Sequence, residues 1–198
     1  KTHPQLLGNA IREITPDRYG NLWLGTEDNG INSYNPRTGE ITNYSYNNPG
    51  HPLSATNIHG LLAVENQLWV GTFNKGIDVL DIPSGKIIKH YSRENSQTNL
   101  NSNFILCFYK TRENELLVGT SNGLMIYNKQ TESFSPWNNI YALIRQIYQD
   151  SRGDIWVATS NGIYHYLRKE NKVEQYRSGS NKSESTVRNT ILRNSPLI

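Results

Sequence analysis

One five-residue phrase recurs four times in this 198-residue chain, and it constrains the fold more than any other feature. Each copy begins with an aliphatic residue and ends in Gly-Thr or Ala-Thr, and three copies have Trp in second place. The copies are Leu22–Thr26, Leu68–Thr72, Leu116–Thr120 and Ile155–Thr159. Their final threonines are separated by 46, 48 and 39 residues. A strand-rich repeat of about 40 to 50 residues predicts a β-propeller in which each repeat forms one blade.

The residues around each phrase predict four antiparallel strands per repeat, which we call A to D from the inside of a propeller outward. The expected blades span about residues 10–45, 58–91, 104–137 and 142–177. Residues 187–198 begin with a run similar to strand A, which predicts the start of a fifth blade. We therefore expect an all-β chain, a β-propeller segment of about four four-stranded antiparallel blades plus the first strand of a fifth.

Polar turns join the expected strands. Asp17 and Asp150 open the A–B turns of the first and fourth repeats, where an Asp side chain accepts a hydrogen bond from the backbone two residues on. The second repeat shortens this turn to Glu65-Asn66-Gln67. In the B–C turns, pairs such as Asn29-Gly30 favour type I′ hairpins. We interpret all of these turns as scaffold.

The tryptophans of the repeated phrase are predicted to be structural. Trp23, Trp69 and Trp156 occupy equivalent positions, and Leu117 replaces the fourth. We expect them to pack between neighbouring blades rather than to bind a ligand. The glycine of the phrase is expected where two blade sheets approach closely, because a small residue is needed there.

Composition and motifs argue against several function classes. The net charge is +3 and the basic residues are scattered, so we expect no nucleic-acid surface. The five histidines show no metal-ligand spacing, and the chain has no nucleophile elbow and no glycine-rich phosphate loop. We therefore expect no catalytic residue, no metal and no cofactor. The single Cys107 cannot form an internal disulfide and leaves the redox compartment open.

The ends of the chain favour a piece of a longer polypeptide. The sequence opens at Lys1 without Met or a leader, and it has no apolar run long enough for a membrane helix. An arc of four blades also leaves two apolar faces in water, because repeat units bury such faces only against neighbours. We therefore expect the segment to contact the rest of a propeller or to self-associate.

The repeat as a whole resembles the two-component regulator propeller repeat in the sensor regions of hybrid two-component proteins of gut Bacteroides and relatives. The first repeat carries nearly all of the shared pattern, in Asp17–Thr26, Gly30–Asn35 and Thr38–Glu40. Departures are Leu117 for Trp, Ala158 for Gly, and a shortened lead-in before the fourth repeat. The resemblance covers about residues 9–193.

This resemblance implies the periplasmic sensor part of an inner-membrane protein. In that family, two seven-bladed propellers precede a β-sandwich domain, a membrane helix, a histidine kinase, a receiver and a DNA-binding region. It implies that this chain belongs to a seven-bladed propeller, senses a glycan-derived oligosaccharide and signals to a cytoplasmic phosphorelay that regulates transcription. The chain itself would be no enzyme, its parent would be a histidine kinase, and the membrane would be reached only through other parts of the parent.

Candidate ligand-binding residues lie on the face shared by the B–C and D–A connections, because the D–A connections are the long ones. Three strand-A positions align at the channel mouth, Arg12, His59 and Arg145, with Leu106 as the exception. Positive groups there would attract an acidic sugar, although arginine at this position also suits hydrogen bonds to neighbouring loop carbonyls. The other candidates on this face are His51, Phe73, Asn74, Lys75 and Tyr141. Phe73 is notable because the repeat calls for no aromatic residue there, and sugar rings stack on aromatic faces.

Two alternative functions remain open from the residues alone. A carbohydrate-active propeller enzyme, a glycosidase or a lyase, would need carboxylates such as Glu13, Glu27 and Asp28 to meet across the channel. A protein-binding propeller scaffold would bind no sugar and would retain a protein partner.

Overall fold

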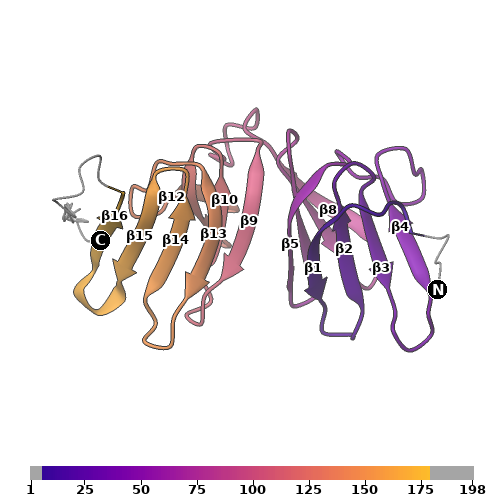
Figure 1. The fold of residues 1–198 in the computed structure, drawn as a ribbon. Helices are drawn as coiled ribbons and strands as arrows, with labels where there is room; N and C mark the ends of the chain where they lie inside the picture. Colours follow the sequence, from indigo (N-terminus) through magenta and orange to yellow (C-terminus); the bar gives the residue numbers. More distant parts are fainter. Residues whose placement is uncertain (1–5, 179–198) are drawn as a thin grey trace.

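The computed structural model describes residues 6–178, which form four separate sheets of four strands each (Figure 1). In every sheet the strands follow sequence order, and each neighbouring pair is antiparallel. The sheets form an arc with the A strands toward its middle, and the A strands of consecutive sheets contact one another. The predicted all-β architecture of four-stranded antiparallel blades is therefore confirmed.

The strand bounds define four blades. Blade 1 consists of β1 (Ile11–Pro16), β2 (Leu22–Thr26), β3 (Ile31–Tyr34) and β4 (Ile41–Tyr44). Blade 2 consists of β5 (Ile58–Val64), β6 (Gln67–Thr72), β7 (Ile77–Asp81) and β8 (Lys86–Tyr91). Blade 3 consists of β9 (Ile105–Lys110), β10 (Leu116–Thr120), β11 (Gly123–Asn128) and β12 (Ser133–Pro136). Blade 4 consists of β13 (Ile144–Gln149), β14 (Ile155–Thr159), β15 (Gly162–Leu167) and β16 (Lys172–Tyr176).

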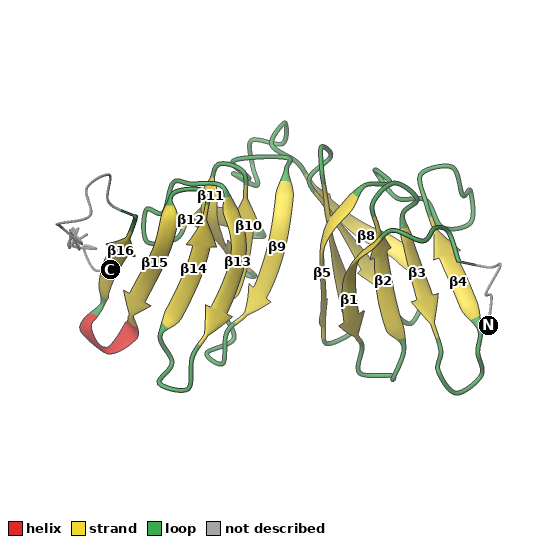
Figure 2. Cartoon of the chain, in the orientation of Figure 1, coloured by secondary structure: helices red, strands yellow, loops and turns green. Residues whose placement is uncertain are grey.

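Helix is nearly absent from residues 6–178. A 3₁₀ turn, η1 (Arg168–Glu170), joins β15 to β16, and loops connect the remaining strands (Figure 2). Within these residues no helix has the length and apolar character that crossing a membrane requires. The expected fifth blade at residues 187–198 lies outside the described part of the chain, and a seven-bladed ring remains a prediction.

The turn chemistry follows the sequence in the A–B turns but not in the B–C turns. Asp17 Oδ1 accepts hydrogen bonds from the amides of Tyr19 and Asn21, as expected for an Asp-led turn. The type I′ prediction for the B–C turns is wrong, because that turn needs two residues with positive φ. In blade 1 Gly30 alone has a positive φ, 93°, whereas Asn29 does not. The threonine that ends the phrase supplies the missing constraint, since Thr26 Oγ1 donates to Gly30 O and accepts from Asn29 N.

A hydrophobic cluster fills each of the three seams between blades. Trp23 and Trp69 are 2% and 3% exposed and pack toward the following blade, as the sequence predicts. The glycine of the phrase lies at the tightest point of each seam. A Cβ atom on Gly71 would lie 2.6 Å from Ile105 Cγ2, and one on Gly119 would lie 2.7 Å from Ile144 Cγ2. The predicted close approach of neighbouring sheets is therefore present.

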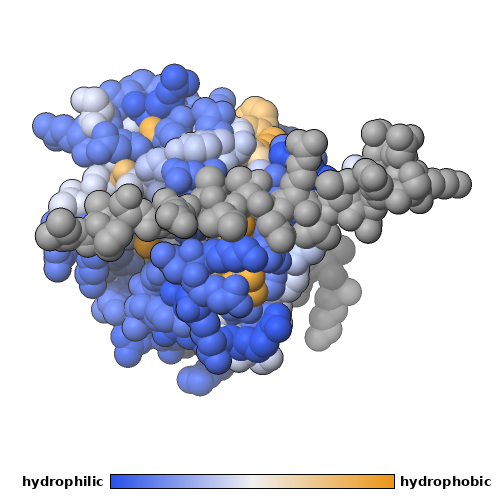
Figure 3. Space-filling model, turned by 90° about the vertical axis from the view of Figure 1, so that its left-hand side faces the viewer, coloured by the Kyte–Doolittle hydropathy of each residue, from blue (hydrophilic) through white to orange (hydrophobic). Residues whose placement is uncertain are grey.

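The open ends of the arc differ from the seams. Trp156 of blade 4 is half-buried and stacks on His165, with ring centroids 3.7 Å apart. On the outward faces of blades 1 and 4, Ile14 is 63% exposed and Tyr148 is 60% exposed. The side of the molecule near β16 is mostly hydrophilic with isolated hydrophobic residues (Figure 3). These faces carry the residue types that fill the seams elsewhere, but no described blade covers them.

Candidate functional site

A β-bulge near the start of every A strand aims one side chain per blade. The pairing register of strand A with strand B shifts at this point in all four blades. The extra residues are Arg12, His59, Leu106 and Arg145. Because a bulge leaves its extra residue unpaired and redirects it, these aligned positions share one backbone geometry. The sequence alignment of Arg12, His59 and Arg145 therefore reflects a repeated structural feature.

The structure brings Arg12 and His59 together across the mouth of blades 1 and 2. Arg12 Nη1 lies 3.4 Å from His59 Nδ1, and Arg12 Nη2 donates to Glu27 Oε1 at 3.2 Å. Glu27 follows β2, and its amide donates to Ala10 O in the segment before β1. The B–C turn and the A strand of blade 1 thus hold this ion pair at the surface.

Phe73 belongs to the same surface group and contacts an aromatic residue that the sequence did not single out. Its ring centroid lies 4.3 Å from that of Phe104 and 5.5 Å from that of His59. His59 also meets Phe104 edge-on at 5.3 Å. Phe73 is 44% exposed, so the pair presents an apolar surface to solvent. We call Arg12, Glu27, His59, Phe73 and Phe104 the aromatic cluster.

Phe104 carried a signal that the sequence argument overlooked. Its carbonyl accepts the hydrogen bond from the B–C turn that Ala10, Asn57 and Leu143 accept in the other blades. Phe104 thus occupies an equivalent position directly before strand A, where the other repeats have a smaller or polar side chain. An aromatic residue there departs from the repeat in the same way as Phe73.

The aromatic cluster carries little net positive charge. The negative charge of Glu27 offsets the positive charge of Arg12. The Arg12 side chain is 40% exposed and the Glu27 side chain is 46% exposed. Partial burial, together with the neighbouring Arg12 charge, lowers the pKa of His59 below its ordinary value of 6.5. The imidazole is therefore neutral near pH 7. This arrangement suits stacking and hydrogen bonding to a neutral polyol better than attraction of an acidic one.

The remaining predicted residues are distributed around the cluster or lie apart from it. Asn74 and Lys75 follow Phe73 in an exposed turn, where Lys75 N donates to Thr72 Oγ1 at 2.9 Å. The ring of His51 lies 4.5 Å from that of Tyr44 between centroids, and its Nδ1 lies 3.4 Å from Gly85 O.

Tyr141 and Arg145 lie in the fourth repeat, away from the aromatic cluster in the chain. Tyr141 is 64% exposed and donates to Asn139 Oδ1 at 3.1 Å. Arg145 is exposed on β13 and has no partner among residues 6–178. Leu106 occupies the intervening bulge of blade 3, so the cationic positions do not form a continuous ring.

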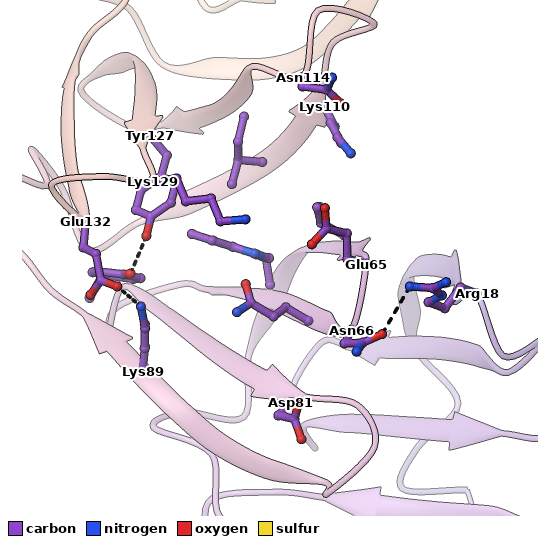
Figure 4. A pocket seen from close by; sticks show the side chains of 15 residues that line it. Arg18, Glu65, Asn66, Asp81, Lys89, Lys110, Asn114, Tyr127, Lys129 and Glu132 are labelled. Atoms are coloured by element: carbon purple, nitrogen blue, oxygen red, sulfur yellow. Dashed lines mark hydrogen bonds and ion pairs between the residues drawn. The ribbon is translucent and has the colours of Figure 1, made fainter.

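A cleft of about 550 Å³ opens on the opposite face, at the seam between blades 2 and 3 (Figure 4). Its wall in blade 2 includes the short A–B turn Glu65-Asn66, and its wall in blade 3 includes Lys110 and Lys129. Figure 4 shows Lys129 and Glu65 reaching from opposite walls toward the middle of the cleft. The sequence argument placed ligands on the face of the long loops and missed this cleft.

A second chemically distinct group lies on the open face of blade 4. One ligand atom each from Asp150, Asp154 and His165 falls within 4.8 Å of the others. Arg152 forms ion pairs with both carboxylates, at 3.2 Å and 3.6 Å. The guanidinium thus supplies the positive charge that these two carboxylates need.

Comparison with known proteins identifies the repeat. The family described as two component regulator propeller matches residues 5–28 and 136–161. The extracellular domain of the hybrid two-component system BT3049 from B. thetaiotaomicron superposes with a TM-score of 0.74 and 28% identity. That match covers 89% of this chain and 23% of the other. The extracellular domain of BT4673 from the same organism gives a TM-score of 0.71 at 22% identity, over 88% of this chain and 25% of its own, and shows the fold alone.

Histidine kinase P4 of Formosa agariphila is 33% identical to this chain over 168 residues. The match covers 78% of this chain but 12% of that kinase, so the chain spans a small part of each of these relatives. The repeat family, the solved relatives and the four four-stranded sheets agree with one another. This chain is a β-propeller segment with two stretches, residues 5–28 and 136–161, that match the two-component regulator propeller repeat, and it is similar to segments of the extracellular domains of hybrid two-component systems.

Proposed function

We propose that this chain is part of the periplasmic ligand-sensing region of a hybrid two-component sensor histidine kinase, and that it detects a glycan-derived oligosaccharide. The similarity to the extracellular domain of BT3049 supports the sensor role. In this proposal the parent protein passes the signal to a cytoplasmic phosphorelay that regulates transcription. Binding, without turnover, is the task of the segment itself.

The aromatic cluster is the observation that carries the proposed ligand class. Phe73 and Phe104 present adjoining rings at the surface, and an apolar ring face is the partner that the C–H face of a sugar requires. Arg12 and Glu27 border them with donors and acceptors for hydroxyl groups. Because the charges of this pair offset one another, we propose a neutral sugar ring at this site.

A binding experiment with matched variants tests this proposal. The chain is titrated with neutral oligosaccharides from plant and animal glycans by isothermal calorimetry, and the best ligand is then tested on Phe73→Ala. We expect about a tenfold loss of affinity, since one stacking contact contributes about 1–1.5 kcal/mol. Tyr148→Ala, which removes an exposed aromatic side chain of blade 4, should bind like the parent chain. Unchanged affinity in Phe73→Ala would place the sugar elsewhere, and release of products over hours would favour the glycosidase or lyase alternative.

We propose in addition that the outward faces of blades 1 and 4 contact the rest of a propeller or a second copy of the chain. Ile14, Tyr148 and Ile163 are 63%, 60% and 45% exposed on these faces. Hydrophobic residues exposed on blade faces that no neighbouring blade covers favour association. Light scattering at several concentrations should show a mass that rises with concentration, and a monomer at all concentrations would contradict self-association.

A further inference from the structure

The cleft between blades 2 and 3 exists because one A–B turn is short. In blades 1 and 4 this turn begins with Asp, and the Asp side chain accepts the indole N–H of the Trp in the phrase. Trp23 Nε1 donates to Asp17 Oδ2 at 2.9 Å, and Trp156 Nε1 donates to Asp150 Oδ2 at 3.2 Å. Blade 2 has only Glu65 and Asn66 between β5 and β6, and it lacks this Asp.

Because blade 2 lacks this carboxylate, the indole N–H of Trp69 has no protein partner at the equivalent position. Trp69 is 3% exposed and lines the cleft, yet its Nε1 has no acceptor among residues 6–178. This N–H is not among the fully buried unpaired polar atoms of residues 6–178, so it reaches solvent at the cleft and is available to donate to a ligand. A ligand oxygen in the cleft would take the place that Asp17 and Asp150 hold in their own blades.

Two ammonium groups of the same cleft form no ion pair with another side chain of residues 6–178. Lys110 at the end of β9 and Lys129 after β11 line it, and neither forms an ion pair or hydrogen bond in the described chain. The third lysine of the lining, Lys89, is paired with Glu132 at the outer end. Glu65 and Asp81 add acceptors to the wall formed by blade 2. An occupant with a negative charge toward the blade 3 wall and hydroxyl groups toward the blade 2 wall would match this lining.

We propose that this cleft is a second ligand site and that it takes a carboxylate-bearing sugar of about disaccharide size. Lys129 binds the carboxylate near the middle of the cleft, Lys110 adds positive charge at its inner end, and Trp69 Nε1 donates to a sugar oxygen. The volume of about 550 Å³ lies within the range of small-molecule sites. The choice of a sugar rests on the proposed function, whereas the site and its preference for an anion rest on the cleft itself.

Calorimetry with digalacturonate as the probe tests this site. We expect saturable binding to the whole chain that weakens as salt is raised, because the contact is an ion pair. Lys129→Ala should lower the affinity at least tenfold, since a hydrogen bond to a charged group contributes about 1.5–3 kcal/mol, and Lys129→Arg should restore most of it. Trp69→Phe removes the N–H and keeps a smaller aromatic ring, and it should lower the affinity severalfold. Lys86→Ala, an exposed lysine outside the cleft, is the matched control.

Each contrary result is decisive. If digalacturonate does not bind, or binds Lys129→Ala as tightly as the parent chain, the proposal is overturned. If cellobiose binds the cleft equally well, the anion preference is wrong. If inorganic phosphate displaces digalacturonate at equal concentration, the cleft is a general anion site and the sugar assignment is wrong. Phe73→Ala should leave digalacturonate binding unchanged, so failure of the aromatic cluster and failure of the cleft are separable.

Discussion

The seam between blades 3 and 4 is closed at its A–B turn edge, whereas the seam between blades 2 and 3 is open there. Gln149 lies at the centre of the closed edge, where its Oε1 accepts from Arg112 N at 2.9 Å and its Nε2 donates to Glu113 at 2.8 Å. Arg168 extends this network to Glu115 at 2.5 Å. The open seam has the Tyr91–Tyr127 hydroxyl contact at 2.8 Å and the Lys89–Glu132 ion pair, both toward its outer side.

The apolar layers of the two seams are alike, so the difference lies in the turns. Gly71 meets Ile105 in one seam, and Gly119 meets Ile144 in the other, at nearly the same separation. Blade 4 has a five-residue Asp-led turn, Asp150–Asp154, that reaches blade 3 through backbone oxygens. Blade 2 has two turn residues and reaches less far. Repeats with the same core thus acquire different chemistry where a few turn residues are lost.

The largest effects are expected from breaking the feature that both seams share. Gly119→Val and Gly71→Val each place side-chain atoms against the isoleucine of the next blade. Overpacking of this kind should lower the free energy of unfolding by about 2–3 kcal/mol in both variants. Unfolding in guanidinium chloride measures the free energy of unfolding of both variants. A much smaller cost for Gly71→Val would show that the open seam is loose in its apolar layer as well.

Removing the polar network that closes the seam between blades 3 and 4 should lower the free energy of unfolding by a smaller amount. The matched change in the seam between blades 2 and 3 should have almost no effect. Arg168→Ala breaks the contacts with Glu115, Glu113 and Gly153 O and should lower the free energy of unfolding by about 1–2 kcal/mol, a figure discounted for partial solvent exposure. Lys129→Ala in the open seam is the matched control and should change the free energy of unfolding by less than about 0.5 kcal/mol. Equal losses in the two variants, measured by thermal unfolding, would contradict the distinction between the seams.

Lengthening the short turn should convert the open seam toward the closed one. Replacing Glu65-Asn66 with the sequence of Asp150–Asp154 supplies a carboxylate for Trp69 Nε1 and should raise the free energy of unfolding by about 1 kcal/mol. The same change should abolish digalacturonate binding. A turn of equal length made of Gly and Ser tests chain length alone and should give no gain in stability. If both turns stabilise equally, the carboxylate is not the cause.

The smallest expected effect is an acid dependence confined to the closed seam. The hydrogen bond from Gln149 lowers the pKa of Glu113 below its ordinary value of 4.5. A carboxyl whose pKa is lower in the folded state stabilises the fold above pH 4.5, and this contribution is lost as the pH falls through the lowered pKa. The Tm of Glu113→Gln should therefore lie slightly below that of the parent chain at pH 6 and converge with it near pH 3. A constant difference across this range would contradict the assignment.

The fold was predictable because each of the four repeats carries the same sequence pattern. Four copies of the phrase placed the strands, and the aligned bulge positions Arg12, His59 and Arg145 were found from spacing alone. Phe73 was found because it departs from the repeat. Phe104 departs from it equally, but its nearness to Phe73 depends on how two blades pack, and sequence spacing does not give that distance.

The sequence by itself determined the blade, since alternating apolar residues and the small residue in Gly-Thr or Ala-Thr specify a strand pair and a packing face in each repeat. Tertiary structure alone decided which turns meet across each seam. The cleft follows from a turn of blade 2 facing strands and turns of blade 3, and within residues 6–178 it leaves the Trp69 N–H and the ammonium groups of Lys110 and Lys129 without protein partners. Such a juxtaposition depends on the angle and separation between two sheets, because side chains from different repeats meet only after the blades have packed.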